Sequence, residues 1–296
     1  MKRKKDQRAL HLMMLPGMIF LFIFSFIPMF GIVMAFQNYM PAKGILGSPW
    51  VGLDNFKFMF QMPDSKQIFI NTIVIAVGKI ILSTFVTIIF ALLLNEIKNK
   101  FVKKGVQTIV YLPNFLSWVI LATVVVNIFA YDGPINTILG AFGIDPVLFM
   151  ASNKWFRFVL IVTDVWKGFG YGAIIYLAAL SGIDPGLYEA AAIDGANRFK
   201  RIWHITLPGI LPTIMLVTIM NLPNVLNAGF DQIFNLYNPL VMQTSDIIDT
   251  WVYRVGLVGR QYSLGTAVGL LRSIVGIVLM LSANKIAKKV TDYRIF

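Results

Sequence analysis

The sequence predicts an all-α integral membrane protein with six transmembrane helices and both termini in the cytoplasm. The prediction depends on an apolar composition, six long apolar runs, and an uneven distribution of Lys and Arg between the loops. Of the 296 residues, 57% are hydrophobic and 14% are charged. Soluble globular domains hold roughly 45–50% apolar and about 25% charged residues. The composition therefore excludes a monomeric water-soluble protein.

The six runs are long enough to cross a bilayer, which takes about 20 mostly apolar residues in helical form. The first run follows the basic residues at positions 2–5, as in a signal peptide. It is too long for a signal sequence and no small-residue cleavage site follows it, so we expect a retained anchor. The predicted spans are residues 12–36, 68–94, 106–130, 158–180, 209–230 and 264–287.

The distribution of basic residues predicts the orientation. With Lys285 counted in the C-terminal segment, the termini and the loops between spans two and three and between four and five carry 16 Lys and Arg, against seven in the alternate loops. Cytoplasmic loops are the Lys- and Arg-rich ones. The net charge of +12 is thus assigned to topology and lipid headgroups, not to nucleic acid.

The remaining segments are too short for a separate soluble domain. The longest, 37–67 and 231–263, are rich in Pro, Gly, Asn and aromatic residues and are expected to form ordered caps on the outer face. The whole chain, 1–296, is therefore expected to form one transmembrane domain.

The sequence lacks the residues that most catalytic and cofactor sites require. It has no cysteine and two histidines, His11 and His204, both placed at or outside the inner membrane edge. It has no phosphate-binding G-x-x-x-x-G-K-[ST] loop and no H-E-x-x-H metal motif. No metal or cofactor is therefore expected in this chain, and an intramembrane enzyme is disfavoured.

The predicted cytoplasmic segment 181–208 reads as two short helices with a break. Asp184 is a favourable N-cap and Pro185 suits the first helical position. An alanine-rich stretch follows up to Asp194, and Gly195 allows a turn. A helix with a small-residue face suits close docking into a groove of another protein. The alternative is an amphipathic loop on the headgroups, anchored by the basic residues Arg198, Lys200 and Arg201.

The spacing in this segment resembles the EAA loop of binding-protein-dependent ABC importer permeases. The motif comprises Glu189, Ala190 and Ala191, then Asp194-Gly195, and after nine further residues Ile205-x-Leu207-Pro208. Outside the loop, residues 50–56 resemble the start of the carbohydrate branch of these permeases. Residues 227–239 and 249–254 resemble its polysaccharide and oligosaccharide subgroup, the LplB/YteP-like proteins.

The resemblance implies a division of labour. The chain would have the type I ABC importer permease fold, lie in the bacterial plasma membrane, and form half of a sugar path without being an enzyme. Its partners would be a second homologous permease, two ATP-binding subunits that hold ATP and Mg, and an extracellular solute-binding protein. The coupling residues would be Glu189, Ala190, Ala191, Asp194, Gly195, Ile205, Leu207 and Pro208.

A polar stripe in the fifth span is the candidate substrate path. Sugars need hydrogen-bonding side chains, and polar groups at membrane depth usually face an aqueous path or a bundle interior. Pro223 invites a kink there. The alternative is that the asparagines bond between helices or to the partner permease. The candidate residues are Asn221, Asn224, Asn227 and Asp231, with Tyr237 at the outer mouth.

Apart from Lys285, four charged residues fall inside the predicted spans. Asp164 and Lys167 are three apart on one helix and are expected to form a neutralised pair. A lone Asp164 would instead suit the alternative function, an ion-coupled secondary transporter acting as a homodimer. Lys79 and Arg272 have no obvious partner in the sequence. The spacings Gly168–Gly172 and Gly265–Gly269 permit close helix packing.

Overall fold

The computed structural model describes residues 2–291. Within them, the ordered elements are helices, and the sole β contact is an isolated bridge between Gln37 and Trp50. Of the basic C-terminal residues that contributed to the predicted topology, Arg294 lies outside the described residues. The described part divides into two compact units, the residues up to Ser65 with Val252–Ser273, and Lys66–Trp251 with the residues from Ile274 onward.

The first unit begins with one long apolar run that buries little of itself. Of residues 10–36, Ala35 alone is buried. The loop that follows is ordered by Asn55, whose amide donates to the carbonyls of Ala35 at 2.9 Å and Gln37 at 3.0 Å. The elements are α1 (Lys2–Leu21), a π-helical turn (Phe22–Phe26), α2 (Ile27–Met29), a 3₁₀ turn (Phe30–Phe36), α3 (Gly44–Gly47), α4 (Asp54–Gln61), a π-helical segment (Val252–Val258) and the first part of α16 (Tyr262–Thr291).

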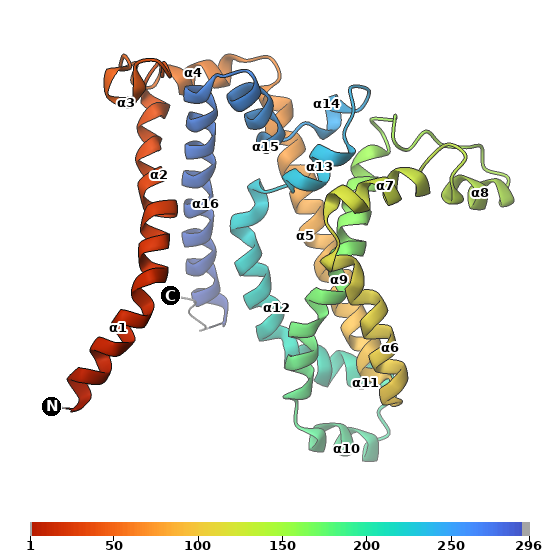
Figure 1. Ribbon diagram of the computed structural model, residues 1–296. Helices are drawn as coiled ribbons and strands as arrows, with labels where there is room; N and C mark the ends of the chain where they lie inside the picture. Colours follow the sequence, from red (N-terminus) through yellow and green to blue (C-terminus); the bar gives the residue numbers. More distant parts are fainter. Residues whose placement is uncertain (1, 292–296) are drawn as a thin grey trace. The chain divides into compact units, whose positions relative to one another are not determined.

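The second unit is built around two long helices, α5 (Ser65–Glu96) and α9 (Phe156–Ser181), which appear in orange and green in Figure 1. The others are α6 (Lys100–Tyr111), a 3₁₀ turn (Leu112–Phe115), α7 (Trp118–Ile128), α8 (Pro134–Ala141), α10 (Pro185–Ile193), α11 (Arg198–Arg201), a π-helical turn (Ile202–Thr206), α12 (Leu207–Asn221), a 3₁₀ turn (Leu222–Leu226), α13 (Phe230–Leu236), α14 (Met242–Ser245) and α15 (Ile248–Trp251).

Five of the predicted spans are long apolar helices. They are Leu10–Phe36, Ser65–Glu96, Phe156–Ser181, Arg198–Leu226 and Tyr262–Ser282. The third predicted span, 106–130, is instead two helices, Lys100–Phe115 and Trp118–Ile128, which meet at 106°. The bend follows from local sequence, because Pro113 lies in the terminal 3₁₀ turn and the Ser117 side chain caps α7 by accepting from the Ile120 amide.

The fifth predicted span is wrong at its C-terminal end. The helix ends at Leu226, and α13 begins at Phe230. Gly229 lies between them with φ at +92°. Glycine adopts this conformation without the steric cost that a side chain would bring. The chain therefore leaves the helix four residues before the predicted boundary at residue 230.

Two hydrophobic clusters hold the second unit together along α5. Ile75 and Ala76 pack with buried residues of α7, α9 and α13, and Ala91 packs with residues of α9 and α12. The close approach of α6 and α9 occurs at Gly170, where a Cβ atom would lie 2.6 Å from the Val110 carbonyl oxygen. The predicted contact glycine Gly168 faces open space instead.

Candidate functional site

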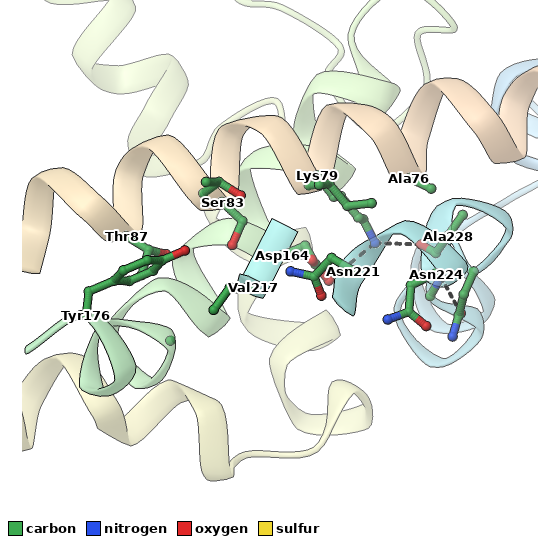
Figure 2. Close-up of a pocket in the computed structure, with 15 residues that line it drawn as sticks. Ala76, Lys79, Ser83, Thr87, Asp164, Tyr176, Val217, Asn221, Asn224 and Ala228 are labelled. Atoms are coloured by element: carbon green, nitrogen blue, oxygen red, sulfur yellow. Dashed lines mark hydrogen bonds and ion pairs between the residues drawn. The ribbon is translucent and has the colours of Figure 1, made fainter. Parts of the chain in front are cut away.

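A cavity of about 370 Å³ lies between the two clusters of the second unit. This volume falls within the usual range for small-molecule sites, about 300–1,000 Å³. Its wall on α5 is one helical face, because the lining residues recur at intervals of three and four. The α5 residues are Ala76, Lys79, Ile80, Ser83, Thr84 and Thr87, and the others include Asp164, Gly172, Tyr176, Val217 and Asn221 (Figure 2).

The charged centre of the cavity is Lys79. Its ammonium lies 3.3 Å from Asp164 Oδ1 and donates to the Ala228 carbonyl at 2.7 Å and to Gln232 Oε1. The Lys79 side chain is 8% exposed, whereas that of Asp164 is 34% exposed. The three donor positions of the ammonium are thus occupied by α9, α13 and the break before α13. The carboxylate is the charged group that remains open to the cavity.

The break before α13 is adapted to this lysine. A Cβ atom on Gly229 would lie 3.0 Å from Lys79 Nζ. Gln232 is fully buried, and its amide donates to the Leu160 carbonyl and to Thr163 Oγ1, both at 2.8 Å. One hydrogen-bonded network therefore links α5, α9 and the start of α13.

The structure brings together three of the five predicted path residues. Asn221, Asn224 and Asn227 all line the cavity. Asn221 ends α12 and the next residues form a 3₁₀ turn, whose three residues per turn place positions three apart on one face. Asp231 is exposed in the first turn of α13, and Tyr237 packs against the cluster that contains Ile75 and Ala76. Neither of the two is among the residues that line the cavity.

The predicted pairing of Asp164 with Lys167 is wrong. Asp164 pairs with Lys79, and the Lys167 ammonium donates to the carbonyls of Pro113, Asn114 and Leu116 at 2.8–3.3 Å. Lys167 thereby satisfies carbonyls at the bend that follows α6, of which that of Pro113 also accepts from the Leu116 amide at 3.2 Å. Asp164 is also not the lone titratable carboxylate that an ion-coupled transporter would need.

Hydroxyl side chains at the other end of the cavity were missed in the sequence. Figure 2 shows Tyr176 beside Thr87, at the opposite end from Asn224 and Ala228. Ser83, Thr84 and Thr87 recur at intervals of one and three in an otherwise apolar stretch, a signal that was available. Tyr176 offers no such signal, because a tyrosine in an apolar helix is ordinarily a packing residue.

The predicted coupling segment forms α10 and its turn. The Asp184 side chain accepts from the Gly186 amide at 2.9 Å, as an N-cap does. At the other end Gly195 has φ at +72°, and the amides of Gly195 and Ala196 donate to the carbonyls of Ala192 and Ala191. This is the Schellman arrangement, which ends a helix in a defined direction.

No residue of α10, all of which the structure describes, is buried. Glu189, Ala190, Asp194 and Gly195 are exposed, and Ala191 is half-buried. Figure 1 shows α10 beyond the end of α9, far from α13 and α14. The segment is therefore a rigid, accessible helix at one end of the second unit.

The segment returns to the unit through the π-helical turn. The hydroxyls of Tyr188 and Thr206 lie 3.1 Å apart, and Ile183 packs so closely on Gly209 that a Cβ atom there would lie 2.8 Å from Ile183 Cδ1. The predicted coupling residues Ile205 and Leu207 are half-buried, and Pro208 is exposed in the first turn of α12.

Within residues 2–291 no cluster of His, Asp or Glu could hold a metal ion.

Comparison with known proteins identifies the family. Residues 87–292 match the model of the binding-protein-dependent transport system inner membrane component. The chain is 40% identical over 293 residues to Protein LplB of Bacillus subtilis (strain 168), covering 99% of this chain and 92% of that one. It is 41% identical to the polygalacturonan/rhamnogalacturonan transport system permease protein YteP of the same organism, covering 98% and 91%.

A solved structure agrees over nearly the whole chain. It is the crystal structure of a bacterial ABC transporter involved in the import of the acidic polysaccharide alginate. The two chains superpose with a TM-score of 0.89 at 38% identity, covering 98% of each. The chain thus belongs to the binding-protein-dependent inner membrane components, as a multi-pass permease of a sugar ABC importer in the bacterial plasma membrane.

Proposed function

We propose that this chain is one of two homologous permeases in a type I importer, with six spans, both termini in the cytoplasm and residues 1–296 acting as one membrane domain. Two ATP-binding subunits would supply ATP hydrolysis, and an extracellular protein would deliver the sugar. A complex of this kind supports the proposal, since a 37% identical chain occurs in a bacterial alginate ABC transporter with an alginate pentasaccharide-bound periplasmic protein. The substrate class is an oligosaccharide.

The observation that carries the proposal is α10. Its exposure and its two defined ends suit a helix that seats in a groove of an ATP-binding subunit. Glu189 is the charged contact, Ala190 and Ala191 allow close approach, and Asp194 bonds across the joint before Gly195 turns the chain. Ile205, Leu207 and Pro208 hold the segment to the membrane domain.

The cavity of the second unit supplies this chain's share of the sugar path. Asn221, Asn224 and Asn227 present amide groups that donate to and accept from sugar hydroxyls. Asp231 and Tyr237 are proposed to act further along the path, outside the cavity. The chain holds no ATP or Mg itself.

The coupling role is tested with Glu189→Ala and Gly195→Asp in the assembled complex. Truncating one partner of a buried charged contact costs about 2–5 kcal/mol, so association with the ATP-binding subunits weakens at least about tenfold. Gly195→Asp strains the left-handed residue that ends α10. Both variants are expected to reach the membrane and to lose sugar uptake.

The matched control is Glu96→Ala, an exposed glutamate at the end of α5. Uptake of an oligosaccharide pool and recovery of the partner subunits by mass spectrometry are measured together. The pool is prepared from polygalacturonan, alginate and galactan. Normal uptake and normal recovery of the ATP-binding subunits in both variants would refute the coupling role of α10. Recovery of the chain as a homo-oligomer without any ATP-binding subunit would refute the importer itself.

A further inference from the structure

The end of the cavity nearer α10 holds a buried hydroxyl without a partner. Tyr176 is 2% exposed, and it packs with Ala173, Leu180 and Ile210 in the cluster that contains Ala91. Tyr176 is nevertheless among the residues that line the cavity, and its buried hydroxyl has no hydrogen-bond partner within residues 2–291. Buried side-chain hydroxyls almost always have a partner in the protein or in a bound molecule.

The surroundings of this hydroxyl are polar but uncharged. Ser83 and Thr87 of α5 line the same end, and Gly172 of α9 leaves space opposite Thr87, since a Cβ atom there would come within 3.4 Å of Thr87 Cγ2. Thr87 is eight residues beyond Lys79, which on a helix is about 12 Å. The charges of the cavity are therefore concentrated at the other end.

Three hydroxyls facing one space match the chemistry of a carbohydrate hydroxyl. Each is one donor and up to two acceptors, so they bond to a group that also donates and accepts. An ammonium or a carboxylate would find no opposite charge at this end. The asparagines and Lys79 lie at the far end of the cavity, about 16 Å of α5 separating Ala76 from Thr87.

We propose that Tyr176, with Ser83 and Thr87, forms a second sugar subsite that holds a ring hydroxyl after the sugar leaves the asparagine stripe. The inference rests on the proposed import function and names a contact that this function does not require. The Tyr176 hydroxyl donates to the sugar oxygen, and the α5 hydroxyls complete the site.

Tyr176→Phe removes this hydroxyl and no protein hydrogen bond. The control is Tyr171→Phe on the same helix, where the ring is 50% exposed and packs edge-on against Phe115. The complete complex, with its second permease, ATP-binding subunits and binding protein, is tested in proteoliposomes with the pool of polygalacturonan, alginate and galactan oligosaccharides. Loss of one neutral hydrogen bond is expected to raise the KM for uptake by about three- to tenfold. The melting temperature without sugar stays equal or rises.

Two results would overturn the subsite. Equal KM values for Tyr176→Phe and Tyr171→Phe would mean that the Tyr176 hydroxyl bonds to a water molecule and not to the sugar. A lower melting temperature of Tyr176→Phe without sugar would mean that the Tyr176 hydroxyl stabilises the fold through a hydrogen bond within the protein. If the wild-type complex imports nothing from the pool, the import function fails instead.

A direct probe of the subsite does not depend on transport. The chain has no cysteine. Thr87→Cys therefore gives the complex a single thiol, provided that the other subunits are prepared without cysteine. The oligosaccharide pool is expected to slow its labelling by a charged methanethiosulfonate, and to leave labelling of Leu46→Cys, a fully exposed position in α3, unchanged. Equal labelling rates of Thr87→Cys with and without the pool would overturn the proposal.

Discussion

Replacing Lys79 with methionine removes the charged centre of the cavity while it keeps the length of the side chain. The substitution deletes the ion pair with Asp164 and the donor to the Ala228 carbonyl and to the Gln232 amide oxygen. The expected result is a less stable membrane domain, because these acceptors remain in place without their common donor.

The magnitude follows from the burial of each group. Breaking a fully buried ion pair by removing one partner costs about 3–5 kcal/mol. Asp164 is 34% exposed to the cavity, so its carboxylate keeps part of its hydration and the pair contributes less. The two unmade hydrogen bonds add about 1 kcal/mol each. A total of about 3 kcal/mol corresponds to a fall in Tm of about 6–12 °C for a unit of this size.

The assay is thermal unfolding of the purified complex in detergent, with two further variants. Lys57→Met breaks an ion pair with Asp54 of similar length, 3.1 Å, in which both side chains are more than two-thirds exposed. Exposed pairs contribute about 0–1 kcal/mol, so this control is expected to melt close to the wild type. Adding Asp164→Asn to Lys79→Met removes the stranded charge and restores part of the lost stability.

Two outcomes would refute this account of the network. One is a Lys79→Met complex that melts within about 2 °C of the wild type. The other is a double variant no more stable than Lys79→Met alone, which would mean that Asp164 is not the group left unpaired.

Two further predictions concern α9. Gly170→Ala places a Cβ atom 2.6 Å from the Val110 carbonyl oxygen, so we expect little folded protein in the membrane fraction. The control Gly168→Ala adds its Cβ atom in open space and is expected to express normally. Equal yields of the two variants would contradict the close packing of α6 on α9. Lys167→Met removes a donor from three carbonyls at the bend of the third span, of which that of Pro113 keeps the Leu116 amide. We therefore expect a loss of about 1–3 kcal/mol in the same melting assay, and an unchanged Tm would show that water replaces the ammonium without cost.

Hydropathy predicted the long helices well, because the requirement for about 20 apolar residues is a property of each segment alone. The breaks were harder to place. Pro113 and Ser117 carried a signal for the bend in the third span, but an uninterrupted apolar run outweighed it. The end of the fifth span depends on one left-handed glycine, Gly229, which sequence composition does not distinguish from the other glycines.

The sequence predicted the asparagines of the candidate site but not its ion pair. Asn221 and Asn224 share one face because residues three apart align on a 3₁₀ turn, and Asn227, directly after this turn, lines the same cavity. The ion pair was assigned incorrectly because a single sequence favours the local neighbour Lys167 over Lys79, which is 85 residues from Asp164 along the chain. Such a long-range pair follows from the packing of α5 on α9.

The path from α10 to the cavity contains a single unbroken helical run. Helical turns continue from Arg198 through α12 to Leu226, a length of about 43 Å. The Tyr188–Thr206 hydroxyl contact and the Ile183–Gly209 packing tie α10 to the lower part of this run. A displacement of α10 would therefore be transmitted through these two contacts and along the run to Asn221 and Asn224 near its opposite end, because continuous helical turns connect residues 198 and 226.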